Sequence, residues 1–499
     1  MKRQLKNPVF IISASIVFIL VILGAFNPSG FGSVATTLFQ FTTVNFGWFY
    51  LLSVFGFVIF LVALALSKYG KIKIGPPDSE PEYPFFTWIG MLFSAGFGAG
   101  LVFWGVAEPM SHFFTTPFSE LNAQTEEAAR VAMGYAFFHW GVNQWSVFAI
   151  VGLLIAYLQF RKNKNGLVST ALEPVLGKKK TVKHTIDSLA VIATVMGVAT
   201  SLGLGILQMN GGLKAVFDVP NSIWVQLMIT GVLLGLYLIS SSTGLNKGIK
   251  WLSNINLGLC LLLLTFVFIA GPTVFILNSF TLGIGDYISN FVGYSLRLTP
   301  YEGGSWLREW TIFYWAWVIA WSPFVGAFVA RVSRGRSIRQ FIFGVLVVPP
   351  AIACFWIATF GGTALNSDLN QGTEIAKAVN NDVTVALFET YQHLPMTEIL
   401  SLLSILLIAT FLITSADSAT YILASMTTNG SLTPALPIKI IWGVLMAAIA
   451  GVLLVAGGLN ALQTASLVSA LPFTVVIILF VYAFTKMIRK ESVTQSSEH

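Results

Sequence analysis

Apolar residues gather into long runs along most of the 499-residue chain, and short polar connections separate the runs. A segment of roughly 20 mostly apolar residues is long enough to cross the hydrocarbon core of a bilayer as an α-helix. Twelve runs meet this requirement, so we expect twelve membrane-spanning helices. They cover approximately residues 9–29, 47–67, 86–109, 133–160, 187–212, 222–241, 251–276, 306–331, 338–361, 397–424, 438–457 and 462–485.

The composition agrees with an all-α integral membrane protein. Hydrophobic residues make up 55% of the chain and charged residues 10%, whereas about a quarter of a typical soluble domain is charged. Cys260 and Cys354 both lie inside apolar runs, and their spacing indicates neither a disulfide nor a metal site. The net charge of +7 resides in connections between the runs, so it indicates membrane orientation and not nucleic-acid binding.

Lysine and arginine concentrate in alternate connections, as the positive-inside rule requires of a correct count of spans. An even number of spans places both termini on one side, and the basic bias predicts that this side is the cytoplasm. The five exceptions, on the opposite side, are Arg130, Lys214, Arg297, Arg308 and Lys377. Two long outer segments, 277–305 and 362–396, are either helices lying on the membrane surface or plain loops.

Glycine and proline interrupt two of the runs. The third contains Gly96, Gly98 and Gly100, and the eighth contains Pro323 and Gly326. Unwound backbone at membrane depth must line a protein cavity, because lipid cannot satisfy its polar groups. Close packing of helices through small residues is the alternative explanation for the glycines.

The two interrupted runs are five spans apart, a spacing typical of transporters built from two inverted repeats with the substrate between them. We therefore expect spans 3–7 and 8–12 to form the repeats, with spans 1 and 2 peripheral. The expected regions are 1–85 (N-terminal tail and spans 1–2), 86–276 (first repeat), 277–305 (outer connection), 306–485 (second repeat) and 486–499 (cytoplasmic tail).

The tenth run is unusually polar, with hydroxyl groups and Asp417 crowded between Thr410 and Thr420. Polar side chains are costly inside a membrane, so their presence there indicates a function. Hydroxyl and carbonyl oxygens suit a hard cation such as Na⁺. Alternatively, these hydroxyl groups bond back to carbonyls of their own helix.

Aromatic residues lie well inside two of the predicted spans. The fourth carries Trp140, Trp145 and Phe148, and the eighth carries Trp317 and Trp321. Membrane tryptophans often form belts at the lipid–water interface, but these lie too deep for that explanation. Aromatic faces attract cations, including quaternary ammonium groups that cannot donate hydrogen bonds. The pattern favours a small cationic or zwitterionic solute.

Three long motifs carry a resemblance to the betaine/carnitine/choline transporter (BCCT) family, and the similarity covers nearly the whole chain. They are FYWAWVIAWSPFVGAFVARVSRGRSIRQFI at 313–342, SAGFGAGLVFWGVAEP and FLITSADSAT. The resemblance implies a leucine-transporter-like inverted-repeat fold, alternating access, a homotrimer in the cell membrane, and import of a betaine-type compatible solute by sodium symport.

The resemblance also implies the solute-binding residues. The family's Trp–Trp–Tyr triad falls on Trp140, Trp145 and Phe148, and its W-x-W-W-x-x-W pattern falls on Trp315, Trp317, Val318 and Trp321. Phe148 replaces the usual tyrosine, and Val318 replaces a tryptophan of the aromatic box in betaine carriers. Gly96, Gly98 and Gly100 would line the pocket. These two departures put ectoine, proline betaine, carnitine and choline beside glycine betaine as candidate solutes.

Sodium-coupled members of the family are similar to this chain at their cation site. The match assigns the hydroxyls of Thr414 and Ser415 and the backbone carbonyls of Ser94, Phe97 and Phe411 as ligands. A second site would use Thr194, although Val198 stands where another threonine is expected. Sodium-independent exchangers use a buried arginine, and no lysine or arginine lies near the middle of a predicted span. Asp417 leaves proton coupling open.

The sequence argues against other classes of protein. It contains no catalytic constellation, so we do not expect an enzyme or a cofactor other than the coupling ion. Of five histidines, only His139 is predicted to lie within a span, and Glu108 is expected to pair with an arginine. A channel or an osmosensor is a less favoured alternative, as is proton-coupled or exchange transport of choline, carnitine or ectoine. Anionic lipids are expected partners.

Overall fold

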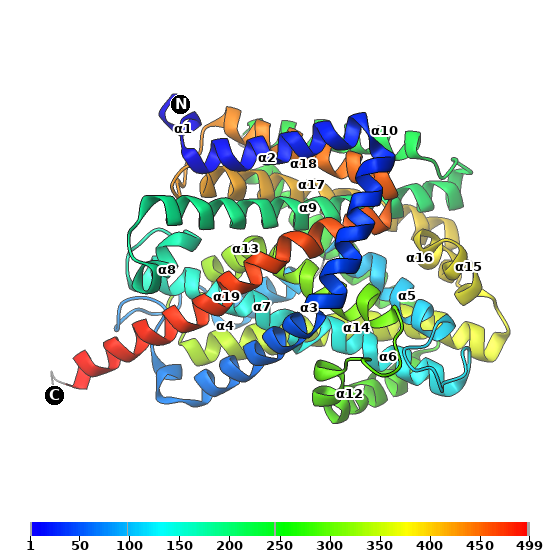
Figure 1. The fold of residues 1–499 in the computed structure, drawn as a ribbon. Coiled ribbons are helices and arrows are strands. Elements are labelled where there is room, and N and C mark those ends of the chain that lie inside the picture. Colours follow the sequence, from blue (N-terminus) through cyan, green and yellow to red (C-terminus); the bar gives the residue numbers. More distant parts are fainter. Residues whose placement is uncertain (1, 97, 244–245, 497–499) are drawn as a thin grey trace.

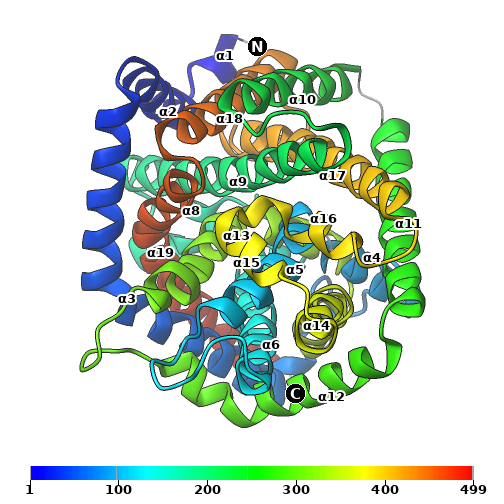
Figure 2. The same ribbon diagram turned by 90° about the vertical axis from the view of Figure 1, so that its right-hand side faces the viewer.

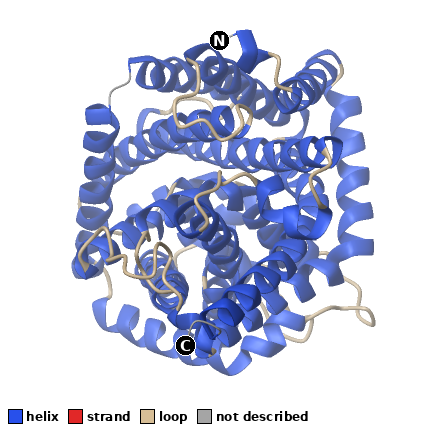
Figure 3. Ribbon diagram, turned by 90° about the vertical axis from the view of Figure 1, so that its left-hand side faces the viewer, coloured by secondary structure: helices blue, strands red, loops and turns tan. Residues whose placement is uncertain are grey.

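The computed structural model describes residues 2–96, 98–243 and 246–496. Helices joined by short loops account for almost all of these residues, and no β-strand occurs in the described ranges (Figure 3). An isolated antiparallel bridge joins Lys73 to Ser337. The predicted all-α class is therefore confirmed for the part of the chain that the structure describes.

The helices follow one another along the chain with few long connections. The first half contains α1 (Lys2–Leu5), α2 (Pro8–Phe26), α3 (Pro28–Leu66), η1 (Lys68–Lys71), α4 (Phe85–Gly96), α5 (Ala99–Phe114), α6 (Glu126–Trp140), α7 (Val142–Ala156), η2 (Tyr157–Arg161), α8 (Val168–Leu176), α9 (Lys180–Phe217) and α10 (Ile223–Thr243). The second half contains α11 (Asn246–Ala270), α12 (Thr273–Leu296), η3 (Arg308–Ile312), α13 (Phe313–Val332), α14 (Ile338–Gln371), α15 (Ile375–Asn381), η4 (Val383–Val385), α16 (Ala386–Tyr391), α17 (Thr397–Met426), α18 (Leu436–Gly457) and α19 (Leu459–Ser496).

The third predicted span is divided, as its glycines indicate. Across the described residues, 11 helical segments are long and apolar enough to cross a membrane. The third predicted span falls on α4 and α5, which have 12 and 16 residues and are each too short to cross alone. Gly98 precedes α5 with an extended backbone (φ −172°, ψ 168°). The extended backbone of Gly98 thus separates α5 from α4.

The predicted break in the eighth span is wrong, because α13 runs continuously past Pro323. Proline has no N–H to donate to the carbonyl of residue 319. The hydroxyl of Ser322 donates to that same carbonyl of Ile319 at 2.7 Å, and it replaces the missing bond. Gly326 serves packing instead: a Cβ there would lie 2.9 Å from the backbone nitrogen of Gly152 on α7.

Replacing Ser322 with alanine should lower stability, because it leaves the buried Ile319 carbonyl without a side-chain donor. The free energy of unfolding should fall by about 1–3 kcal/mol. A lower midpoint of thermal or denaturant unfolding in detergent would show this loss. Ser146→Ala is the matched control. Ser146 donates to the Asn143 carbonyl at 2.7 Å, but residue 147 is not proline and supplies the regular helical bond. Equal losses in the two variants would contradict the role given to Ser322.

The fourth span contains an interruption that was not predicted. Helix α6 ends at Trp140 and α7 begins at Val142, with Gly141 between them. The Val142 N–H donates to the hydroxyl of Tyr287 on α12 at 2.8 Å. A Cβ on Gly141 would lie 2.5 Å from that hydroxyl oxygen, so glycine leaves room for the tyrosine.

The long outer segments are helical, so the plain-loop alternative is wrong for most of their length. Residues 277–305 contribute most of the 24-residue helix α12, which crosses below α6 and α14 in Figure 2. In the same view α3 and α11 flank opposite sides of the helix bundle. Residues 362–396 hold the end of α14 together with η4 and the short helices α15 and α16.

Segments predicted to share a side of the membrane contact one another. On the predicted inner side, the Ile74 N–H donates to the Arg336 carbonyl at 2.8 Å and Lys486 reaches the Pro174 carbonyl at 2.8 Å. On the predicted outer side, Arg130 pairs with Asp286 at 2.7 Å. In Figure 1 both ends of the chain lie in the left-hand half of the view, and the sidedness of the termini stays a prediction.

Candidate solute site

The aromatic residues singled out in the sequence meet in one cluster between α6, α7 and α13. The Trp140 and Trp317 rings are edge-to-face with centroids 6.2 Å apart, and Trp317 stacks over Trp321 at 6.4 Å. Trp321 contacts Phe148 at 6.1 Å, and Phe148 contacts Trp145 at 5.2 Å. These five residues, which we call the aromatic cluster, form an unbroken series of ring contacts.

The broken third span lies against this cluster. A Cβ on Gly100 would lie 2.7 Å from Cη2 of Trp317 and 3.5 Å from Cη2 of Trp140. A Cβ on Gly98 would meet no atom within 4 Å among the described residues other than its chain neighbours. Gly96 is the last residue of α4. The start of α5 therefore lies beside two of the cluster's tryptophans.

One buried polar group in the cluster lacks a protein partner among the described residues. The Trp145 side chain is 3% exposed, and its indole N–H has no hydrogen-bond acceptor within the described ranges. The Trp317 indole, by contrast, donates to the Ser201 hydroxyl on α9 at 3.2 Å. A buried donor without an acceptor is costly, which marks Trp145 as a place where a solute acceptor would gain a hydrogen bond.

Val318 is buried on α13, directly after Trp317. Successive residues of an α-helix are about 100° apart around its axis, so Val318 lies on a neighbouring face and not in line with Trp317. Its assignment as a pocket residue stays a prediction.

The residues predicted to bind sodium lie on α4, α9 and α17, and Phe97 lies outside the described residues. The Thr414 hydroxyl donates to the carbonyls of Thr410 and Phe411 at 3.0 and 3.1 Å, and it accepts from the Asn256 amide at 3.3 Å. The back-bonding alternative therefore holds for this threonine, yet its oxygen keeps acceptor capacity.

The remaining predicted ligands in the described part of the chain lie on α4, α9 and α17. Thr194 donates to the Ala190 carbonyl at 2.7 Å and is fully buried on α9. Ser94 lies near the end of α4, and Ser415 follows Thr414 on α17. Asp417, one turn further, accepts from the Ser240 hydroxyl on α10 at 2.5 Å. Both sodium sites stay predictions.

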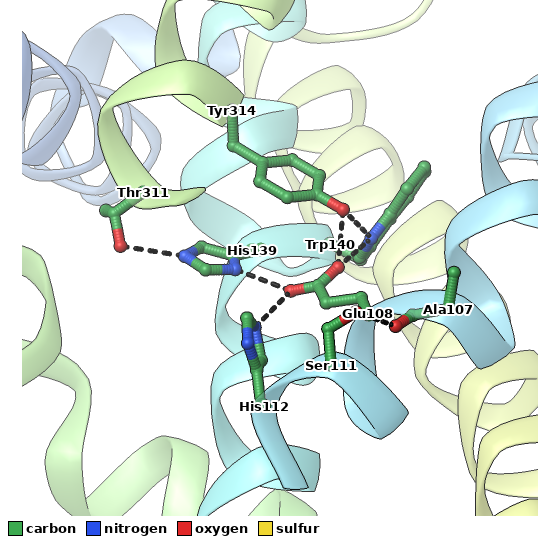
Figure 4. A network of polar contacts seen from close by, with 8 residues as sticks. All are labelled: Ala107, Glu108, Ser111, His112, His139, Trp140, Thr311 and Tyr314. Carbon is green, nitrogen blue, oxygen red and sulfur yellow. Dashed lines mark hydrogen bonds and ion pairs between the residues drawn. The ribbon is translucent and has the colours of Figure 1, made fainter. Parts of the chain in front are cut away.

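A second polar feature adjoins the aromatic cluster and was not predicted. The carboxylate of Glu108 on α5 is completely buried among side chains from α5, α6 and α13 (Figure 4). Its Oε1 lies 2.6 Å from Nδ1 of His139 and 3.3 Å from Nε2 of His112. Its Oε2 accepts from the Trp140 indole at 2.9 Å and from the Tyr314 hydroxyl at 2.5 Å.

This arrangement corrects two predictions. Glu108 pairs with histidines and not with an arginine, and His112 as well as His139 lies inside the helix bundle. The missed signal was the four-residue spacing of Glu108 and His112, which places both on one helix face. Glu108, His112 and His139 also bring potential metal-ligand atoms within 4.8 Å of one another. Both carboxylate oxygens of Glu108 already have hydrogen-bond partners, so the cluster does not require a metal ion.

The chain is similar over nearly its whole length to known transporters. A family profile described as "BCCT, betaine/carnitine/choline family transporter" matches residues 8–493. An ectoine/hydroxyectoine transporter of Virgibacillus pantothenticus is 73% identical over 98% of both chains. The glycine betaine transporter OpuD of Bacillus subtilis is 48% identical over 97% of this chain and 95% of its own. An osmo-dependent choline transporter, BetT2 of Acinetobacter baylyi, is 34% identical over 99% of this chain and 73% of its own.

Proposed function

Because the chain belongs to the betaine/carnitine/choline transporter family, we propose that it imports ectoine or a closely related cyclic zwitterion together with Na⁺. It is a multi-pass membrane protein and a secondary transporter of betaine- or ectoine-type compatible solutes, not an enzyme. The observation that supports the finer proposal is the aromatic cluster, which combines several ring faces with the buried, unpaired indole N–H of Trp145.

The chemistry of ectoine fits these two features. Its protonated amidine is flat and delocalised, and such a cation stacks on tryptophan faces much as a guanidinium group does. Its carboxylate requires a donor, and the buried Trp145 N–H offers one. Phe148 and Val318, where betaine carriers have a tyrosine and a tryptophan, fit a solute other than glycine betaine. The 73% identity to an ectoine/hydroxyectoine transporter supports the same choice.

We propose a coupling mechanism based on the broken span. Na⁺ would join the end of α4 to α17 through oxygens of Ser94, Phe97, Phe411, Thr414 and Ser415, and a second Na⁺ would bind at Thr194. Ordering the break would place Gly100 and α5 against the aromatic cluster. Solute binding would then permit one helix bundle of an inverted repeat to rock against the other.

The remaining features of the proposal concern the membrane. We propose that the protein lies in the cell membrane with both termini in the cytoplasm, as a homotrimer, and the contacts among the predicted inner segments support this orientation. Anionic lipids would contact the basic run from Arg331 to Arg339. Within that run, Arg336 donates to the Tyr83 carbonyl and Arg339 to the Ala65 carbonyl, which leaves Arg331 and Arg334 as the candidates for lipid contact.

Uptake into proteoliposomes tests this function directly. The purified protein should accumulate radiolabelled ectoine saturably when an inward Na⁺ gradient is imposed, and unlabelled ectoine should compete better than glycine betaine, carnitine or choline. Accumulation driven equally well by a proton gradient without Na⁺ would replace sodium with protons as the coupling ion. Preferred uptake of betaine or choline would overturn the assignment of the solute.

The sodium ligands allow a separate prediction. Replacing Thr414 and Ser415 together with alanine should raise the Na⁺ concentration needed for half-maximal uptake about tenfold or more, because two cation ligands are lost. Thr427→Ala is the control, since Thr427 caps the C-terminal end of the same helix, α17, and its hydroxyl bonds back to the Leu423 carbonyl at 2.7 Å. An unchanged sodium titration in the double variant would remove the assignment.

A further inference from the structure

Trp140 is held in the aromatic cluster at both ends of its indole ring. At one end, its N–H donates to Oε2 of Glu108 at 2.9 Å. At the other end, its Cη2 atom faces the position of a Cβ on Gly100. The ring therefore spans the distance between a buried carboxylate and the start of the helix that follows the break.

We propose that Glu108 is a positioning residue for solute binding, and that it acts by fixing the indole of Trp140. This inference rests on the proposal that the aromatic cluster contacts the solute. The contact between Glu108 and Trp140 joins α5 to α6, and the Tyr314 hydroxyl on the same carboxylate oxygen joins both helices to α13. A movement of α5 is thereby passed to the ring that faces Trp317.

A carboxylate is the side chain best suited to this position. Four donor or ring-nitrogen atoms surround its two oxygens, and an ionised carboxylate offers about four lone-pair sites. An amide offers one acceptor oxygen and one NH₂ group, so it can keep the Trp140 and Tyr314 donors only with its NH₂ group toward the two histidine ring nitrogens. Glu108→Gln is nearly isosteric and uncharged, so the Trp140 indole loses the charged acceptor of its hydrogen bond.

The groups around Glu108 are themselves held in place. The His139 ring stacks on Tyr314 with centroids 4.7 Å apart and planes 10° apart, and its Nε2 lies 2.9 Å from the Thr311 hydroxyl. His112 packs against the Trp310 ring at 4.5 Å. These contacts restrict the carboxylate to one orientation and, through it, the Trp140 ring.

The test is a double-mutant cycle on solute affinity. Glu108→Gln and Trp140→Phe should each raise the KM for ectoine about tenfold, which is the expected effect of losing a hydrogen bond to a charged group. The maximal rate should fall less. The double variant should be no worse than the more damaged single variant, because both changes remove one interaction. Trp140→Phe also leaves Glu108 and its other partners in place, so it tests the bond even if Glu108→Gln does not fold.

Asp187→Asn is the matched control. Asp187 is also a buried carboxylate, and it accepts from the Ser169 N–H and hydroxyl at 2.8 and 2.6 Å. Neither hydrogen bond involves a residue of the aromatic cluster. It should lower the unfolding temperature without changing KM. Additive losses in the double variant, or an unchanged KM in Trp140→Phe, would overturn the positioning role.

The proposed function fails in a different way. If Trp317→Ala leaves the KM unaltered, the cluster does not bind the solute and the function proposed for it is wrong. If Trp317→Ala raises KM while Glu108→Gln and Trp140→Phe do not, the cluster binds the solute but Glu108 does not position it.

Discussion

Replacing Trp317 with alanine should raise the KM for uptake roughly 30-fold or more, since a desolvated contact between a cation and an indole face is worth about 2 kcal/mol. Trp317 is at the centre of the aromatic cluster, where it contacts Trp140 and Trp321 and stacks on Phe313 at 5.8 Å. Its loss also removes the hydrogen bond to Ser201 on α9. Concentration-dependent uptake of radiolabelled solute measures the effect.

A tryptophan elsewhere separates lost binding from lost stability. Trp442 on α18 is fully buried, and it donates to the Thr427 hydroxyl at 3.1 Å and packs edge-to-face against Phe10. Trp442→Ala should lower the unfolding temperature at least as much as Trp317→Ala, because removing a buried tryptophan leaves a cavity. It should leave KM unchanged. Equal KM values for Trp317→Ala and the unaltered protein would contradict the role of the cluster.

The substitution Gly100→Ala should weaken solute binding by about tenfold to a hundredfold, although it adds one methyl group. The new Cβ would lie 3.3 Å from Cζ2 of Trp317 and 2.7 Å from its Cη2, and the second distance is shorter than real Cβ contacts. Either the ring or the start of α5 must move, and overpacking of this kind costs about 1–3 kcal/mol. The expected change is in KM, measured beside thermal stability.

Gly90→Ala provides the control within the same broken span. A Cβ on Gly90 meets nothing within 4 Å, and Gly90 lies inside the helix α4. Alanine favours a helix over glycine by roughly 1 kcal/mol, so this variant should be as stable as the original or slightly more stable. If Gly100→Ala transports as well as Gly90→Ala, the start of α5 does not constrain the cluster.

The sequence was most informative where a feature depends on local chemistry. Closely spaced glycines weaken a helix wherever they occur, so the break after Gly96 was predictable. Pro323 was misleading because the compensating donor, Ser322, is adjacent in sequence but acts only through the geometry of a formed helix. Apolar run length predicted where most of the helices form, and the family motifs on the fourth and eighth spans named the rings that meet.

Features that depend on several helices were not predictable in the same way. The partners of Glu108 come from α6 and α13, and no spacing rule places His139 or Tyr314 beside it. The break at Gly141 depends on Tyr287, which approaches from a helix more than a hundred residues later in the chain. A single glycine gives no signal without knowledge of the side chain that fills its space.

The interruption at Gly141 determines how two tryptophans reach the same cluster. In an unbroken helix, residues five apart point in directions that differ by about 140°, so Trp140 and Trp145 would diverge. Because α6 and α7 are separate helices, the direction in which Trp140 points does not fix the direction of Trp145. Efforts to redesign the solute preference should therefore treat α6 and α7 as two helices whose orientations can be changed separately. They should keep the single residue, Gly141, that connects them.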